Sequence, residues 1–180
     1  DYQFQDTNEF TLGDALLSLQ SRHALGGHVL TLNAQGTRTA LRSDKLLLED
    51  GRAESVSRHA LNLGLVDRRQ WKLAGAFRRL VLQAKFRANF TDQFSPRWNG
   101  GLALRADYRE DWQFFTHLSY SNRLPSFNEL YYFGFGNPSL KPEVAAVADG
   151  GVLLREPGGW PLRLKVSGFY NRTRNKIIAI

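Results

Sequence analysis

The feature of this sequence that most constrains its fold is an alternation of apolar and polar residues from Leu80 to Thr91, in which only Val81 departs from the pattern. The even positions are Leu80, Leu82, Ala84, Phe86, Ala88 and Phe90. The odd positions are Val81, Gln83, Lys85, Arg87, Asn89 and Thr91. Because successive side chains of a β-strand point to opposite faces, these twelve residues predict one long strand with an apolar and a polar face.

The same alternation recurs along most of the chain. It is clear at residues 102–108, 112–121 and 162–171, and weaker at 28–35, 60–65, 70–78 and 145–154. These segments predict an all-β chain with about eight antiparallel strands. Before Asp44 the pattern is less regular, and we expect a surface loop and one or two strands there. Within that region, the spacing of apolar residues from Leu12 to Leu19 is also compatible with one or two helical turns.

The length of the strands and the positions of the aromatic residues favour a membrane barrel. Several segments run about ten to twelve residues, whereas strands of globular sheets have roughly five or six and strands that cross a bilayer roughly nine to eleven. Aromatic rings are favoured at membrane interfaces. Aromatic residues lie near the expected strand ends at Trp71, Phe90, Tyr108, Trp112, Tyr120, Trp160 and Tyr170. The alternative is that these rings are core residues of a soluble barrel.

The connections between the expected strands alternate between short and long. Short ones are expected at 67–69, 109–111 and 156–159, and longer ones at 92–97 and 122–143. Outer-membrane barrels have short turns on the periplasmic side and longer loops outside. We therefore expect the strand that ends at Tyr120 to run outward.

Composition excludes several kinds of chemistry. The chain has no cysteine, and its longest apolar runs are far shorter than the roughly 20 residues of a spanning helix. The four histidines are scattered, so we expect no metal site and no cofactor. No catalytic motif supports an enzyme. The net charge of +7 is compatible with nucleic-acid binding, but the aromatic residues lie on the face opposite the basic ones, which argues against it.

Two blocks of sequence identify a family. They are RLPSFNELY at residues 123–131 and GNPSLKPE at residues 136–143. TonB-dependent outer-membrane receptors typically show Arg-x-Pro, then Glu-Leu-Tyr, then Gly-Asn-Pro-x-Leu-Lys-Pro-Glu late in the barrel. The chain resembles this family, with motifs from about residue 112 to 180 and agreement in pattern only before that. Residues 169–180 look most like the cobalamin-receptor type.

The residues of these blocks are expected to form an ordered loop. The prolines fix their φ angles and withhold hydrogen-bond donors, and the two glutamates can pair with basic neighbours. We expect a scaffold made of Arg123, Pro125, Glu129, Asn137, Pro138, Lys141, Pro142 and Glu143. The aromatic residues Tyr131, Tyr132, Phe133 and Phe135 are candidates for contact with substrate at the mouth of the barrel.

On a barrel of this kind the polar positions face the lumen. Those residues are Lys85, Arg87, Arg105, Asp107, His117, Arg163 and Lys165. Their charge should be positive overall, which suits either acidic residues of a plug domain inside the barrel or an anionic substrate. Of the two, we favour pairing with a plug domain over direct contact with substrate.

The resemblance implies an importer in the bacterial outer membrane. It would bind a siderophore, haem or cobalamin at the cell surface and draw energy from TonB through a plug, with outer-membrane lipid as its surroundings. Family barrels have 22 strands, so we expect residues 1–180 to be part of a barrel domain without the plug, and unable to transport alone. A passive porin or a soluble β-barrel that binds a ligand are the alternatives.

Overall fold

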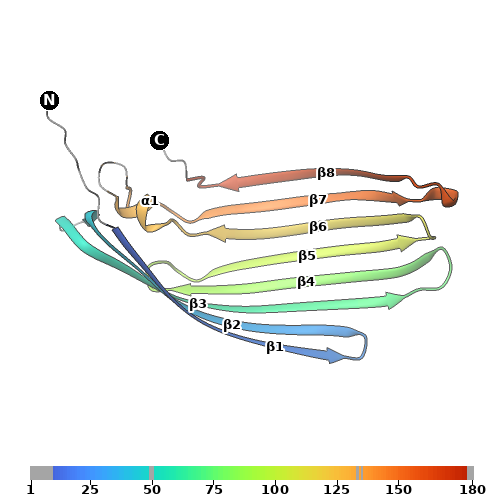
Figure 1. Ribbon diagram of the computed structural model, residues 1–180, viewed down its shortest axis with the longest axis horizontal. Helices are drawn as coiled ribbons and strands as arrows, with labels where there is room; N and C mark the ends of the chain where they lie inside the picture. The colour runs from blue at the N-terminus through green and yellow to red at the C-terminus, as the bar shows by residue number, and fades with distance from the viewer. Residues whose placement is uncertain (1–9, 49–50, 133, 135, 178–180) are drawn as a thin grey trace.

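The computed structural model describes residues 10–48, 51–132, 134 and 136–177, and these form one antiparallel sheet (Figure 1). Its strands, paired in sequence order, are β1 (Phe10–Leu25), β2 (His28–Leu48), β3 (Gly51–Lys72), β4 (Phe77–Thr91), β5 (Arg97–Tyr108), β6 (Trp112–Arg123), β7 (Glu143–Arg155) and β8 (Arg163–Arg174). The helical elements described are α1 (Phe127–Tyr131) and a 3-10 turn, η1 (Pro157–Gly159). The all-β prediction and the antiparallel arrangement are confirmed.

The sheet is a single open layer whose edges are β1 and β8 (Figure 1). The connections 26–27, 73–76, 109–111 and 156–162 lie at one end of the sheet. The connection 92–96 and the longest one, 124–142, lie at the other end, together with α1. We call the latter the outer end. The strands β2 and β3 have 21 and 22 residues, against 12 in β5, and extend past their neighbours at the outer end (Figure 1).

The register brings the alternating apolar residues of neighbouring strands into line. One such row crosses β4 to β8 through Ala84, Leu102, Leu118, Ala148 and Tyr170. Leu102 is 44% exposed, Leu118 49% and Tyr170 64%, because no second layer covers them. We call this side of the sheet the apolar face and the opposite side the polar face.

Buried apolar packing lies at the outer end and not between two layers. Leu41, Leu46 and Phe127 form a buried cluster, with Val56 and Tyr131 packed against it. The cluster joins the extended β2 and β3 to α1, so it positions the helix and does not support the sheet as a whole.

The one or two strands expected before Asp44 are present as β1 and β2. The helical alternative at Leu12 to Leu19 and the turn expected at Asp67 to Arg69 are wrong. Residues Leu12 to Leu19 belong to β1, which pairs with β2 along its whole length. The leucines there occupy both faces of an exposed strand, so the alternation that would have identified it is lost.

Asp67 to Arg69 is also not a turn, because β3 continues through it to Lys72. The reversal comes at 73–76, where Gly75 has a φ of 87° and the Leu73 amide donates to the Arg78 carbonyl over 3.0 Å. Glycine tolerates this positive φ, so the chain can turn at Gly75. The polar residues Asp67 to Arg69 do not end the strand.

The turn expected at 109–111 and the long connection near 122–143 are confirmed, and a connection also lies near 92–97. The turn expected at 156–159 begins there but continues to residue 162, so it is longer than predicted. No helix among the described residues is long and apolar enough to cross a membrane.

A pair of adjacent substitutions tests whether the apolar face contacts lipid. Leu102 lies on the apolar face and Ala103 on the polar face of β5. If this face contacts lipid, Leu102→Arg should destabilise the full-length protein by about 2–4 kcal/mol in lipid vesicles, because a charge near the bilayer midplane is costly. Ala103→Arg is the matched control and should have a much smaller effect. Urea titration of the refolded proteins measures both, and equal effects would contradict the assignment of the faces.

Candidate functional site

The candidate site has two parts, both toward the outer end of the sheet. The first is the connection between β6 and β7, residues 124–142, which we call the rim loop. The second is a polar hollow on the polar face below it.

The rim loop is organised by a capping box around α1. The Ser126 hydroxyl accepts a hydrogen bond from the Glu129 amide over 3.3 Å, and the Glu129 carboxylate accepts one from the Ser126 amide over 2.7 Å. Such a reciprocal pair satisfies two amides at the start of a helix that would otherwise lack partners. Pro125, immediately before the cap, is fully buried. These contacts hold the short helix in place at the rim.

Arg123 connects the rim loop to the strands. Its guanidinium binds both carboxylate oxygens of Glu129 at 3.1 Å, and one of its nitrogens lies 3.6 Å from Glu143 at the start of β7. Glu143 in turn accepts a hydrogen bond from the Ile177 amide over 3.3 Å. Burial raises the pKa of Glu129, but the Ser126 amide and Arg123 together outweigh burial and lower the pKa below its ordinary value. Glu129 is therefore a carboxylate whose charge the loop stabilises.

The remaining predicted scaffold residues have simpler surroundings. The Asn137 amide donates to the Glu129 carbonyl over 2.8 Å, and its side chain accepts from the Ser139 amide over 3.0 Å. Pro142 is buried and its carbonyl accepts a hydrogen bond from Asn175 over 3.4 Å. Pro138 and Lys141 are exposed. The contacts of Asn137 and Pro142 are of the kind a scaffold requires.

The predicted aromatic residues divide into two groups. Tyr131 is partly buried and packs against the cluster of Leu41, Leu46 and Phe127, and Tyr132 forms a backbone bridge with Leu46. Phe133 and Phe135 lie outside the described residues. Contact between these aromatic residues and a substrate stays a prediction.

Arg58 of β3 is a further residue of this region, and sequence reasoning did not identify it. Its guanidinium lies 4.9 Å from the ring centre of Phe127 and 5.4 Å from that of Phe94, in the connection between β4 and β5. Its Nε donates to Gln93 over 2.8 Å, while its buried Nη2 has no hydrogen-bond partner among the described residues. Arg58 thus joins β3, the 92–96 connection and α1 largely through cation–π contacts.

The charged residues predicted to face the lumen occupy the polar face. Lys85 and Arg87 alternate along β4 with apolar residues that belong to the other face. Arg105 lies 3.2 Å from Asp107, which also binds Arg79 at 2.6 Å and Gln113 at 2.9 Å. The charge of Arg105 is therefore partly balanced within the wall. Arg79 was not among the predicted residues.

Three other predicted residues lie further along the same wall. His117 of β6 lies 3.1 Å from Asp149 of β7, nitrogen to carboxylate oxygen. The ammonium of Lys165 lies 4.9 Å from the ring centre of Phe115, and that ring covers Gly151, where any β-carbon would collide with it. Arg163 is exposed at the start of β8.

The polar hollow has a volume of about 360 Å³ and lies on the polar face near the outer end. Its lining includes Lys85, Arg87, His117 and several asparagines. Asparagine side chains form a chain of hydrogen bonds across four strands, from Asn62 through Asn89 and Asn99 to Asn122. The Asn122 amide also donates to the Asn99 side chain over 2.6 Å. The hollow therefore presents uncharged amides beside three basic groups.

This arrangement suits the binding of polar or anionic groups. In the part of the chain that the structure describes, no group of three or more histidine, aspartate or glutamate side chains is placed to hold a metal ion. The amides and basic side chains can donate hydrogen bonds to carboxylates or hydroxyls without transferring a proton.

The pH dependence of the rim loop tests the role of Glu129. The pKa of Glu129 is lower in the folded loop than in the unfolded chain. The ionised carboxylate therefore stabilises the folded loop at pH values above the ordinary glutamate pKa of about 4.3, and this stabilisation is lost as pH falls through the folded-state pKa. We expect the amides of Leu130 and Tyr132 to lose hydrogen-exchange protection in that range, after correction for intrinsic exchange. In Glu129→Gln this acid-dependent step should disappear. Its persistence in that variant would contradict the assignment.

Comparisons with known proteins agree with this geometry. The family model "TonB dependent receptor-like, beta-barrel" matches residues 2–180. The siderophore receptor PirA from Pseudomonas aeruginosa aligns over 91% of this chain and 32% of its own, with a TM-score of 0.75 and 18% identity. A mutant of the ferric enterobactin receptor PfeA from the same organism aligns over 93% and 27%, with a TM-score of 0.74 and 19% identity.

The chain thus spans about a third or less of the length of these solved structures. At such identities, the likeness concerns the fold. No curated protein sequence matches the chain. The family match covers nearly the whole chain, and it agrees with the long antiparallel strands, the exposed apolar face and the two sequence blocks of the rim loop. The chain belongs to the TonB-dependent receptor-like β-barrel family.

Proposed function

We propose that this chain is part of a bacterial outer-membrane receptor that binds a scarce nutrient at the cell surface and imports it with energy from TonB. The observation that carries the proposal is the apolar face with its aromatic borders. Trp98 and Tyr108 lie on that face of β5, ten residues apart. At about 3.3 Å per residue and a tilt of about 40°, they are separated by roughly 25 Å along the membrane normal, the height of the apolar band of such barrels.

The outer end then faces the outside of the cell. Outer-membrane barrels carry their longer loops there, and the rim loop is the longest connection whose ends the structure describes. Its braced helix lies at the mouth of the barrel, and the polar hollow lies below it on the polar face.

The charge of the wall supports an anionic cargo. Lys85, Arg87 and His117 line the hollow beside neutral amides. Such groups attract and hydrogen-bond carboxylates and phenolates. The same groups would serve equally to bind acidic residues of a plug domain. In a TonB-coupled receptor, the plug would connect the barrel to TonB in the inner membrane. Among cargo classes, we favour ferric siderophores, because two solved relatives are described as a siderophore receptor and a ferric enterobactin receptor.

This function requires neither catalysis nor a resident cofactor. The family is one of receptors, and the amides and basic groups of the hollow are suited to binding. We propose that its partners are outer-membrane lipid, a small-molecule nutrient and TonB, and that nucleic acid is not among them.

Fractionation of cells that express the full-length gene product tests the membrane assignment. We expect the protein in the outer-membrane fraction, with migration in gel electrophoresis that changes on heating, as folded barrels show. A known inner-membrane protein and a periplasmic protein serve as controls. Recovery in the soluble fraction would favour a soluble β-barrel instead.

Uptake assays test the cargo and the energy source. In a host that lacks its own receptors, we expect the full-length protein to restore growth on a ferric siderophore, and not on haem or cobalamin. Growth should be lost when TonB is deleted. Growth that is independent of TonB would favour a passive porin, and growth on cobalamin alone would exclude the siderophore assignment.

A further inference from the structure

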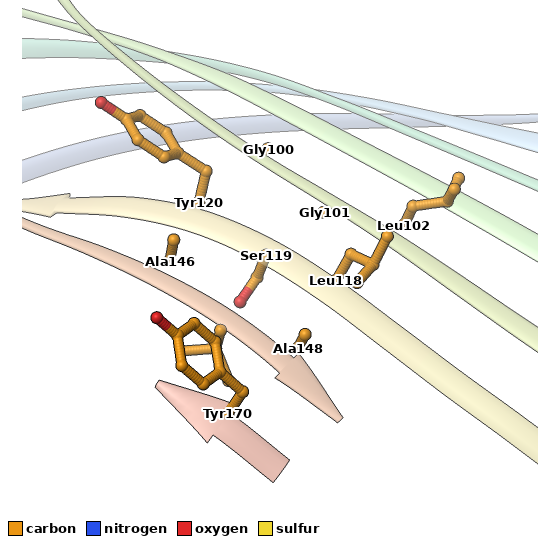
Figure 2. A pocket seen from close by; sticks show the side chains of 10 residues that line it. Gly100, Gly101, Leu102, Leu118, Ser119, Tyr120, Ala146, Ala148 and Tyr170 are labelled. Atoms are coloured by element: carbon orange, nitrogen blue, oxygen red, sulfur yellow. The ribbon is translucent and has the colours of Figure 1, made fainter. Parts of the chain in front are cut away.

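The apolar face is hollowed near the outer end by a groove between two tyrosines (Figure 2). The groove has a volume of about 510 Å³. Its walls include Tyr120 of β6 and Tyr170 of β8, and small residues of the strands around them, Gly100, Ala146 and Ala148, leave the space between the rings open. In Figure 2 both tyrosine hydroxyls point toward the end to which β6 and β8 run, which is the outer end. The groove is apolar along its length and has hydroxyls at one end, as an acyl chain is apolar along its length and ends at a polar headgroup.

Two arginines lie just beyond this groove. The register places Tyr120, Ala146 and Arg172 in one row across β6, β7 and β8. Arg172 and Arg174 follow Tyr170 at two-residue intervals, so all three side chains belong to the apolar face. Both arginines are exposed, and neither has an ion-pair partner among the described residues.

Two unpaired cations on a face that otherwise meets hydrocarbon are costly unless an anion meets them. Along the strands the apolar groove comes first, then the two tyrosine hydroxyls, then the two arginines. A lipid has the same order, with its acyl chain first, then the interfacial region, then the phosphate. The guanidinium group binds phosphate oxygens in a bidentate manner. The complementarity therefore extends to both shape and charge.

We propose that this groove and its two arginines form a binding site for lipopolysaccharide, with a lipid A acyl chain between Tyr120 and Tyr170 and a lipid A phosphate on Arg172 and Arg174. This inference rests on the outer-membrane orientation proposed above, because that orientation places the arginines at the headgroups of the outer leaflet. The groove opens on the face of the sheet opposite the polar hollow, and the two linings share Gly100, Gly101, Ser119 and Tyr120.

Binding of fluorescent lipid A to the purified full-length receptor in detergent tests the site. We expect saturable binding that Arg172→Ala/Arg174→Ala weakens by about tenfold or more, since charge-assisted hydrogen bonds to phosphate are lost. We also expect Ala146→Phe, which fills the groove, to weaken binding while leaving the arginines in place. Raised salt should weaken binding to the wild type more than to the double variant.

Matched variants separate this site from general effects. Arg163→Ala/Lys165→Ala removes two charges from the same strand, and Ala84→Phe adds a ring elsewhere on the apolar face. Both should bind lipid A as the wild type does, and heat-dependent migration confirms that each variant is folded. Wild-type affinity in the double arginine variant and in Ala146→Phe would overturn the proposal. So would binding of phosphatidylglycerol equal to that of lipid A. Failure of nutrient uptake with lipid A binding intact would overturn the importer function and leave this site standing.

Discussion

The structure depends on backbone hydrogen bonds between neighbouring strands, which leave the side chains of both faces free for other tasks. In hydrocarbon an unpaired backbone group costs several kcal/mol, so strands there must pair along their whole length. The pairs β3–β4, β5–β6, β6–β7 and β7–β8 keep one register throughout, and the pair β4–β5 shifts only once, between Phe77 and Arg79. One consequence is that the sheet needs no core in the ordinary sense. Its buried apolar cluster, Leu41, Leu46 and Phe127, holds a helix at the rim and not a second layer.

The sequence predicts the parts of the fold where the two faces differ in polarity. β4 is evident because leucine, alanine and phenylalanine alternate with lysine, arginine and asparagine. β1 is not, because Leu16 and Leu17 place large apolar groups on both faces of one strand. The predicted end of β3 was wrong for a related reason. Polar residues such as Asp67 and Arg68 resemble a turn in sequence, but they lie within a strand whose neighbour continues.

The site was predictable only where its partners are close in sequence. Arg123 and Glu129 are six residues apart, so a loop braced by this pair followed from local chemistry. The capping box of Ser126 and Glu129 was not predicted, although its members are only three residues apart. Arg58 lies far in sequence from Phe94 and Phe127, and only the extension of β3 beyond its neighbours brings them together. The chain of asparagines is similar, since its members come from four strands and meet through the register alone. No spacing rule within one segment indicates such contacts.

The position of Arg123 between two carboxylates has a consequence for how the mouth tolerates change. Glu129 and Glu143 both approach this one guanidinium, from the helix on one side and from β7 on the other. Without the cation, the two acids would face each other as like charges with the same geometry, and the helix would be pushed from the strand that now holds it. A single neutral substitution would therefore reverse the sign of the interaction, so that an attachment becomes a repulsion. The attachment of the helix to β7 therefore depends on that one positive charge.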